Sequence, residues 1–240
     1  MRQHLQGVQR VFLSGGEPLI RKDFVEIAEM FSRDFIVGLP TNATPGRAIA
    51  KRLVGKVSFV NIGLEGPRAI TSRVRGDYDL VLKGIYAFKE AGLPLSFSAV
   101  MYRSTTAGLP FMYQIADVFG AGKVKLIMPI KKGNGLYLKD EEFLSEGEYE
   151  QLFQHLLDLR QQFAWTPSLR MTTWTPQNEG YSILVYPNGE TYAWPVYDAG
   201  DKVEFLGNLK EMTIQEIWAG YRFKKNHLSK YLGKSIRTAL

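Results

Sequence analysis

The sequence of 240 residues contains no cysteine. Disulfides, thiolate-bound zinc, a cysteine nucleophile and a cysteine-ligated iron–sulfur cluster are therefore excluded within these residues. Histidine is also scarce, and His4, His155 and His227 are far apart in the chain, without the short spacings of a metal site. The sequence accordingly predicts no metal-binding residue and no catalytic residue.

Long hydrophobic runs are missing as well. No apolar segment approaches the roughly 20 residues that a membrane-spanning helix needs, and the first seven residues have none of the apolar character of a secretory signal. The hydrophobic share of 45% is nevertheless enough for a sizeable core. We therefore expect a cytoplasmic globular protein without a membrane partner.

The net charge of +6 is mildly basic. Most basic residues are scattered among acids, with local excesses at 47–56 and 222–234. Such runs are typical of solvated helix faces, so no nucleic-acid partner is expected.

The first half of the chain alternates short β-type runs with amphipathic helical stretches. Five strands are expected, at residues 11–13, 35–37, 57–62, 95–101 and 123–127. A helical pattern separates each strand from the next, which predicts parallel strands with right-handed crossovers, in an open α/β sheet or a barrel.

The pattern changes near residues 131–135, where two domains are predicted to meet: 1–135 and 136–240. A helix at Glu148–Phe163 is expected first. A β-hairpin is then predicted from Tyr181–Val185 and Thr191–Trp194, and a helix at Ile214–Ala219 capped by Thr213.

Polar or glycine-containing clusters follow three of the expected strands, at Ser14–Glu17, Thr41–Asn42 and Gly63–Gly66. Sites in α/β folds gather at the carboxyl ends of the strands. Glu17 would place a carboxylate there that can pair with an ammonium group. The residues alone thus indicate a tight βα turn with an exposed acid.

The Gly-Gly-Glu-Pro sequence at residues 15–18 resembles the GGEP motif of radical S-adenosylmethionine (radical SAM) enzymes, which contacts the methionyl amino group of that cofactor. Residues 40–43 resemble the family's "TNG" strand end, with Ala43 in place of glycine. Residues 63–66 resemble the "SLDG" turn near the ribose: Gly63 lacks the hydroxyl, but Glu65 keeps an acid for ribose hydroxyls. Residues 73–79 resemble the family's "hDxxRGxgxf" segment. The resemblance covers about residues 8–130, and the cofactor-binding residues it implies are Gly15, Gly16, Glu17, Pro18, Thr41, Asn42 and Glu65.

Residues 186–193 and 205–218 resemble the SPASM or twitch extension of the same family. In relatives this extension binds auxiliary iron–sulfur clusters, and those relatives mature peptides and peptide-derived cofactors or modify enzymes. Ala193 stands where the cluster cysteine would be. The resemblance thus implies an extension that keeps its fold without its metal.

The family's CxxxCxxC loop lies a few dozen residues before GGEP, whereas fourteen residues precede Gly15 here. The implied fold is a partial (β/α) barrel without its first β-α unit, followed by a small C-terminal α+β extension. S-adenosylmethionine is the implied cofactor, and this polypeptide alone is expected to bind it weakly or not at all. A 4Fe-4S cluster is expected only where the missing part exists, and this chain alone is not expected to generate a radical.

Three interpretations remain open. The chain is an N-terminally incomplete radical SAM enzyme of the peptide- or cofactor-maturation type, with a peptide or protein substrate and with its cluster loop upstream or on another chain. Alternatively, it is a degenerate, non-catalytic relative that binds a peptide or a protein. The third is an unrelated α/β enzyme or a basic nucleic-acid-binding protein. The aromatic-rich stretch Trp165–Tyr197 is read as core packing, with a peptide groove as the alternative.

Overall fold

The computed structural model describes residues 5, 7–129, 137–172, 182–194, 205–220 and 238–239. The chain divides into two compact units. The parallel-sheet unit comprises Gln9–Met128, Glu141–Thr172 and Thr238–Leu240. The C-terminal unit comprises Met1–Val8, Pro129–Asp140 and Thr173–Arg237.

The parallel-sheet unit is a partial α/β barrel, with six parallel strands that follow one another in chain order. These strands are β1 Arg10–Phe12, β2 Ile36–Thr41, β3 Phe59–Gly63, β4 Leu95–Val100, β5 Lys123–Ile127 and β6 Ser168–Thr172. A two-residue strand, β10 Thr238–Ala239, pairs antiparallel with β6. The helices are α1 Phe24–Ser32, α2 Gly46–Leu53, α3 Arg68–Arg75, α4 Tyr78–Glu90, α5 Leu109–Val118 and α6 Glu146–Gln162.

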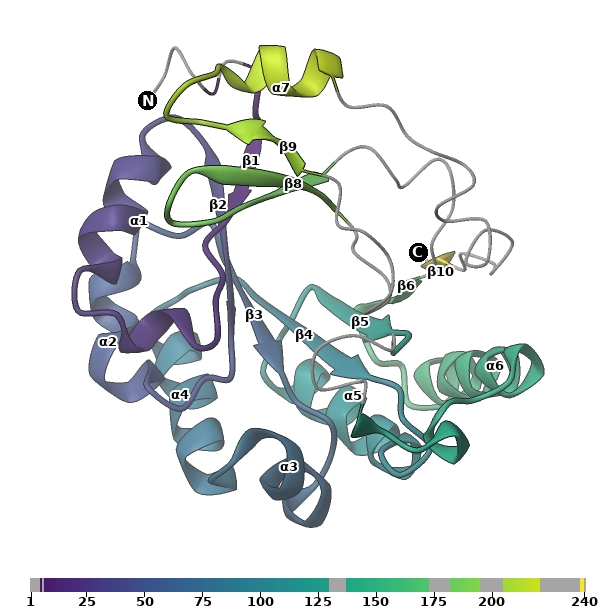
Figure 1. Cartoon of the computed structure of the whole chain (residues 1–240). Coiled ribbons are helices and arrows are strands. Elements are labelled where there is room, and N and C mark those ends of the chain that lie inside the picture. The colour runs from purple at the N-terminus through teal and green to yellow at the C-terminus, as the bar shows by residue number, and fades with distance from the viewer. Residues whose placement is uncertain are drawn as a thin grey trace. The chain divides into compact units, whose positions relative to one another are not determined.

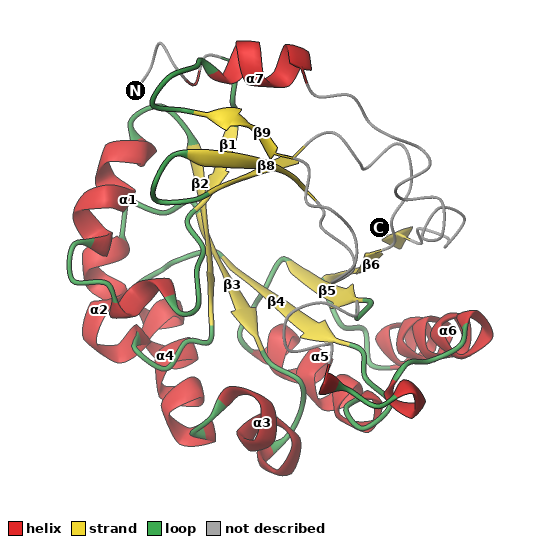
Figure 2. Cartoon of the chain, viewed as in Figure 1, coloured by secondary structure: helices red, strands yellow, loops and turns green. Residues whose placement is uncertain are grey.

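The strands form an arc with the helices along its outer side (Figures 1 and 2). Residues alternate between the two faces of a strand, so each strand contributes one set to the outer face and one to the inner face. The outer set is apolar and buried beneath the helices, and it includes Val37, Leu39, Val60, Ile62, Phe97, Ala99, Val124, Leu126 and Leu169. The core thus lies between the sheet and the helices.

The five predicted strands are confirmed, with small shifts of their ends. Strands β6, β9 and β10 and helix α3 were not expected. Strand β6 alternates polar and apolar residues over five positions as β5 does, so its local signal was present and was missed; its pairing with β5 establishes it. Helix α3 carries Arg68, Arg73 and Arg75 and buries only Thr71, so it has little apolar periodicity to reveal it.

The C-terminal unit contains a three-stranded antiparallel sheet, with β8 between β7 and β9. Its elements are β7 Ser182–Val185, β8 Glu190–Trp194, β9 Phe205–Asn208 and α7 Ile214–Gly220. The predicted hairpin is confirmed. The cap is confirmed as well, because the Thr213 hydroxyl and the Glu216 carboxylate exchange hydrogen bonds with each other's backbone N–H groups.

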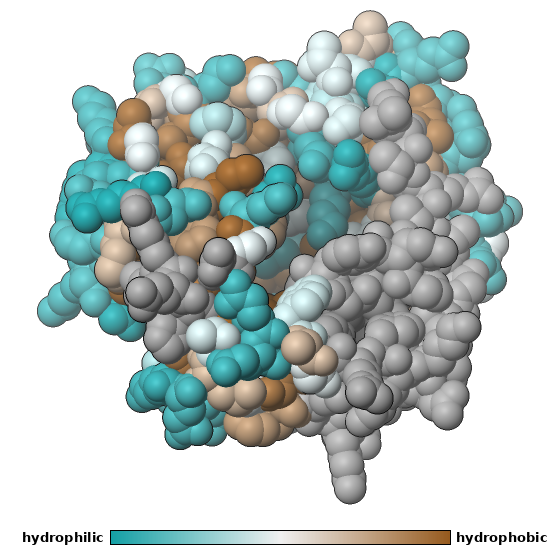
Figure 3. All heavy atoms as spheres, turned by 90° about the horizontal axis from the view of Figure 1, so that it is seen from above, coloured by the Kyte–Doolittle hydropathy of each residue, from teal (hydrophilic) through white to brown (hydrophobic). Residues whose placement is uncertain are grey.

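No helix in the part of the chain that the structure describes is long and apolar enough to span a membrane. In the view of Figure 3, hydrophobic residues lie in small areas between hydrophilic ones. The Trp165 ring lies 4.9 Å from that of the buried Tyr113, which supports the core-packing interpretation for this residue. The rest of the aromatic stretch lies partly outside the described residues.

Candidate functional site

The turn after β1 leads directly into a short 3-10 turn, Pro18–Ile20. Glu17 caps that turn, because its Oε1 accepts the backbone N–H of Leu19 at 3.0 Å. Pro18 occupies the first position, where a missing N–H costs no hydrogen bond. The segment is therefore held in a fixed conformation at the carboxyl end of the strand.

Gly15 and Gly16 are exposed, and a Cβ atom placed on either would meet no other atom within 4 Å. Their φ angles are not in the left-handed region, so the backbone conformation itself does not require glycine. None of the hydrogen bonds among the described residues ends on their carbonyl oxygens. The turn therefore offers exposed backbone acceptors that an approaching ligand can reach.

Glu17 joins this turn to the end of the neighbouring strand β2. Its carboxylate accepts the Thr41 hydroxyl at 2.8 Å on Oε1 and the Asn42 backbone N–H at 2.7 Å on Oε2. The three predicted site residues are thus brought together across the β1 and β2 ends. With the bond from the turn, the carboxylate accepts three hydrogen bonds, and about one of its roughly four acceptor positions remains for a ligand.

The strand end at β2 is itself shaped by short polar contacts. The Asn42 side-chain oxygen accepts the backbone N–H and the hydroxyl of Thr44, at 2.9 and 2.8 Å. Ala43 is fully buried and has a φ of 65°, a left-handed conformation that costs a non-glycine residue about 1 kcal/mol or more. Ala43 therefore adopts a backbone conformation that glycine favours, at the position where the family motif has glycine.

The third cluster, at the end of β3, has a partner that sequence reasoning missed. Glu65 is fully buried, and both of its oxygens accept Nε of Arg75 at 2.9 Å, while one also accepts the Arg75 Nη2 group. A Cβ on Gly63 would lie 2.7 Å from the Arg75 guanidinium carbon. The guanidinium therefore occupies the space that a side chain at position 63 would need.

This ion pair changes which group faces a ligand at β3. A contact between Glu65 and a ribose hydroxyl would require Arg75 to move, since Arg75 occupies both carboxylate oxygens. No described residue accepts a hydrogen bond from Nη1 of Arg75. Burial raises the pKa of the adjacent Tyr102 phenol, and the Arg75 charge opposes that rise. The arginine was detectable in the sequence only as part of the 73–79 segment.

The residues present do not fit an iron–sulfur cluster. The sequence offers no thiolate, and the described residues contain no group of three or more His, Cys, Asp or Glu side chains that could hold a metal ion. His155 lies exposed on α6, and His4 and His227 fall outside the described residues. Ala193, where the family has a cluster cysteine, lies in β8 opposite Ile183.

The family model of the Radical SAM superfamily matches residues 1–107. Among curated proteins, the chain is similar to the PqqA peptide cyclase of Granulibacter bethesdensis, with 25% identity over 236 residues, which cover 89% of this chain and 62% of that protein. It is also similar to a probable GTP 3',8-cyclase of Halobacterium salinarum, with 32% identity over 114 residues, 45% of this chain and 32% of that protein. The chain thus spans less than two thirds of the length of these relatives.

Solved structures share the fold at low sequence identity. The structure described as native anSMEcpe with bound AdoMet has a TM-score of 0.70 at 19% identity, covering 95% of this chain and 69% of the other. Streptococcus suis SuiB bound to precursor peptide SuiA has a TM-score of 0.69 at 13% identity, covering 87% and 53%. At these identities the likeness establishes the arrangement of strands and helices.

Proposed function

Because the chain belongs to the radical SAM superfamily, we propose that the carboxyl ends of β1 and β2 bind S-adenosylmethionine in a protein of the peptide-modifying kind. The observation that carries this proposal is the joining of Glu17, Thr41 and Asn42 beside an open diglycine turn. S-adenosylmethionine supplies a reactive sulfonium when it is bound. Residues of this chain bind and orient it.

The turn after β1 fits the amino group of the ligand's methionyl part. An ammonium donates up to three hydrogen bonds and accepts none, so it needs a group of acceptors. The free carbonyl oxygens of Gly15 and Gly16, and the remaining acceptor position of Glu17, are such a group. Pro18 and Thr41 act indirectly, because they fix the turn and the carboxylate.

A cluster that generates radicals needs thiolate ligands, and these 240 residues contain none. We therefore assign no radical step to this chain, and propose that such chemistry takes its thiolates from polypeptide outside these residues. We make a related proposal about the fold. The six parallel strands would form the family's barrel without its first β-α unit, since the described residues pair β1 on one side only.

The substrate class is proposed from the relatives. Two proteins similar to this chain are described as a peptide cyclase and as an enzyme bound to its precursor peptide. The small sheet β7–β8–β9 follows the barrel, as the SPASM-like interpretation expects. We propose that this chain likewise acts on a peptide, or holds one for a partner that completes the site.

A second function is favoured by one observation. The buried Glu65 already has a complete partner in Arg75, so the β3 end presents no free carboxylate to a ribose. This arrangement suits a non-catalytic relative that binds a peptide or protein and has lost the nucleotide ligand.

The test is S-adenosylmethionine binding, measured calorimetrically on anaerobically purified protein. The wild-type polypeptide alone is expected to bind weakly, and Glu17→Gln to lower that affinity at least tenfold, because the amide would turn a donor toward the Asn42 N–H. Glu26→Gln removes the same charge from an exposed position of α1 and is the matched control. Equal affinity of the wild type and Glu17→Gln would refute the assigned site.

Two further results separate the two functions. Reconstitution with iron and sulfide is expected to leave no stable cluster on this polypeptide, and a stoichiometric cluster would overturn the statement that its residues do not fit one. Peptide binding without any S-adenosylmethionine binding would favour the non-catalytic relative.

A further inference from the structure

The inner face of β5 and β6 carries a row of cationic side chains. Val124 and Leu126 are fully buried on the outer face of β5, so Lys123 and Lys125 lie on the inner face. Arg170 lies beside Lys125, because the two residues are register partners. The helices cover the other side of these strands (Figure 1).

A fourth cation comes from the other end of the sheet. Arg10 on β1 lies with its guanidinium carbon 5.8 Å from the centre of the Phe59 ring. Burial lowers the pKa of Lys123, and the charges of Arg170 and Arg10 lower it further. The charges of Arg10 and Lys123 therefore influence each other, although the three strands β2, β3 and β4 separate β1 from β5 in the sheet. We call Arg10, Lys123, Lys125 and Arg170 the basic cluster.

The basic cluster lacks a counter-charge in the sheet. None of the strands β1–β6 contains Asp or Glu. Among the described residues, no carboxylate lies within 4.0 Å of these four side chains. Burial, Lys123 and Arg170 all lower the pKa of Lys125, and no acid opposes them. The four like charges repel one another, so an anion that binds among them is attracted by each cation.

The neighbouring polar residues leave the cations as the available donors. Asn61 on β3 donates to the Ser98 hydroxyl at 3.0 Å and accepts the Ser96 hydroxyl at 3.0 Å. The side chains of Asn61, Ser96 and Ser98 are therefore hydrogen-bonded to one another. The side chains of Lys125 and Arg170 keep solvent exposure, so a ligand can reach them, although the protein packed around Lys125 partly desolvates its amine and so lowers its pKa.

We propose that the inner face of β5 and β6 binds the carboxylates of an acidic peptide in extended conformation. Lys123 and Lys125 are two residues apart on one strand, about 7 Å, which is also the spacing of alternate side chains in an extended peptide. Arg170 adds a fork of donors that suits a carboxylate. The proposal names the substrate of the peptide-modifying function above and rests on it.

A spread of cations along one strand distinguishes this site from a phosphate cradle. Phosphate sites typically gather backbone N–H groups at a glycine-rich turn or helix start. The basic cluster instead lies on strand interiors, where the backbone N–H groups belong to the sheet. An extended acidic chain matches that row better than one compact polyphosphate.

The experiment measures the fluorescence anisotropy of rhodamine-labelled peptides of about ten residues, which are longer than strand β5 when extended. One peptide alternates Glu with Ser, and the other alternates Gln with Ser. The full chain is expected to bind the Glu peptide at least tenfold more tightly than the Gln peptide. Lys125→Gln and Arg170→Gln are each expected to weaken binding of the Glu peptide about threefold to tenfold.

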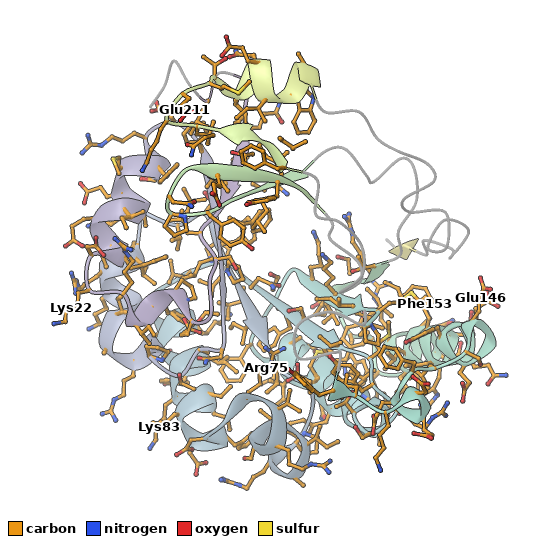
Figure 4. All side chains as sticks on the ribbon, viewed as in Figure 1. Lys22, Arg75, Lys83, Glu146, Phe153 and Glu211 are labelled. Atoms are coloured by element: carbon orange, nitrogen blue, oxygen red, sulfur yellow. The ribbon has the colours of Figure 1, made fainter. Side chains whose placement is uncertain are left out.

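The control is Lys83→Gln, which removes the same charge from the outer surface of α4 (Figure 4). Its affinity for the Glu peptide should equal that of the wild type. A loss as large as that of Lys125→Gln would show attraction to the net charge and overturn the proposal. Equal binding of the Glu and Gln peptides would also overturn it, as would binding of tripolyphosphate without binding of the Glu peptide.

Calorimetry with S-adenosylmethionine on the same proteins separates this inference from the proposed function. Binding of the nucleotide without the Glu peptide would refute the acidic-peptide site alone. Binding of the Glu peptide without the nucleotide would refute the nucleotide site and leave the basic cluster as the peptide site. Variants that keep the wild-type circular dichroism spectrum exclude misfolding as the cause.

Discussion

Gly84→Ala tests how closely α4 approaches the end of β2. A Cβ atom on Gly84 would lie 1.8 Å from the carbonyl oxygen of Ala43 and 2.8 Å from its carbonyl carbon. The Ala43 oxygen cannot yield easily, because it also accepts the Gly46 N–H at 2.9 Å. Relief of the overlap therefore requires the helix and the β2 turn to separate.

The magnitude follows from two opposing effects. Alanine is better than glycine inside a helix by about 1 kcal/mol, whereas overpacking costs about 1–3 kcal/mol, and more when backbone must move. Because the obstacle is a backbone oxygen, we take the overpacking cost as about 3–4 kcal/mol, at or just above the top of that range, and after the helical gain of about 1 kcal/mol we expect Gly84→Ala to lower the free energy of unfolding by about 2–3 kcal/mol. A loss of that size would lower Tm by roughly 4–12 °C in a chain of this length.

The assay is urea unfolding followed by far-ultraviolet circular dichroism. Gly147→Ala is the control, because it makes the same change in the first turn of α6, where an added Cβ meets no atom within 4 Å. The control should be neutral or stabilise the protein by up to about 1 kcal/mol. If Gly84→Ala is as stable as Gly147→Ala, the reasoning from the close contact is wrong.

Two further predictions concern ion pairs of the parallel-sheet unit. Arg75→Met leaves the fully buried Glu65 without its partner and is expected to cost about 3–5 kcal/mol in urea unfolding. Arg68→Met, in an exposed pair that water screens, should cost far less; equal costs would contradict the role given to burial. The pKa of the Glu148 carboxyl is lowered to about 2, first by hydrogen bonds from Arg103 and then from the helix-capping serine. Because the folded pKa lies below the unfolded value near 4.3, the Glu148 carboxylate stabilises the fold above that pH, and this contribution is lost as pH falls toward 2. An NMR titration should show the low pKa of Glu148, and Arg103→Gln should raise it. An unchanged pKa in Arg103→Gln would contradict the assigned cause.

The sequence predicted the parallel part of the fold because each strand and helix there has its own local signal. Short apolar runs alternate with helical periodicity up to β5, and the hairpin of β7 and β8 has a clear turn. Helix α3 has few apolar residues, so neighbouring elements decide it, whereas β6 alternates as β5 does and was missed although its signal is present. The motif residues Glu17, Thr41 and Asn42 were likewise readable from the chain, as residues at the ends of adjacent parallel strands.

The sequence by itself determined that these residues contain no thiolate, and that a GGEP turn follows the first strand. Only the tertiary structure decided how the acids are used. Glu17 faces a neighbouring strand end and keeps an acceptor free, whereas Glu65 is buried against Arg75, ten residues further along the chain. The basic cluster also exists only in the folded sheet, because strand pairing places Arg170 beside Lys125, although the two residues are far apart in the chain. The spacing of residues along a chain predicts side-chain contacts only within one helix or strand. Contacts between residues of different elements depend on how those elements pair and pack in the fold.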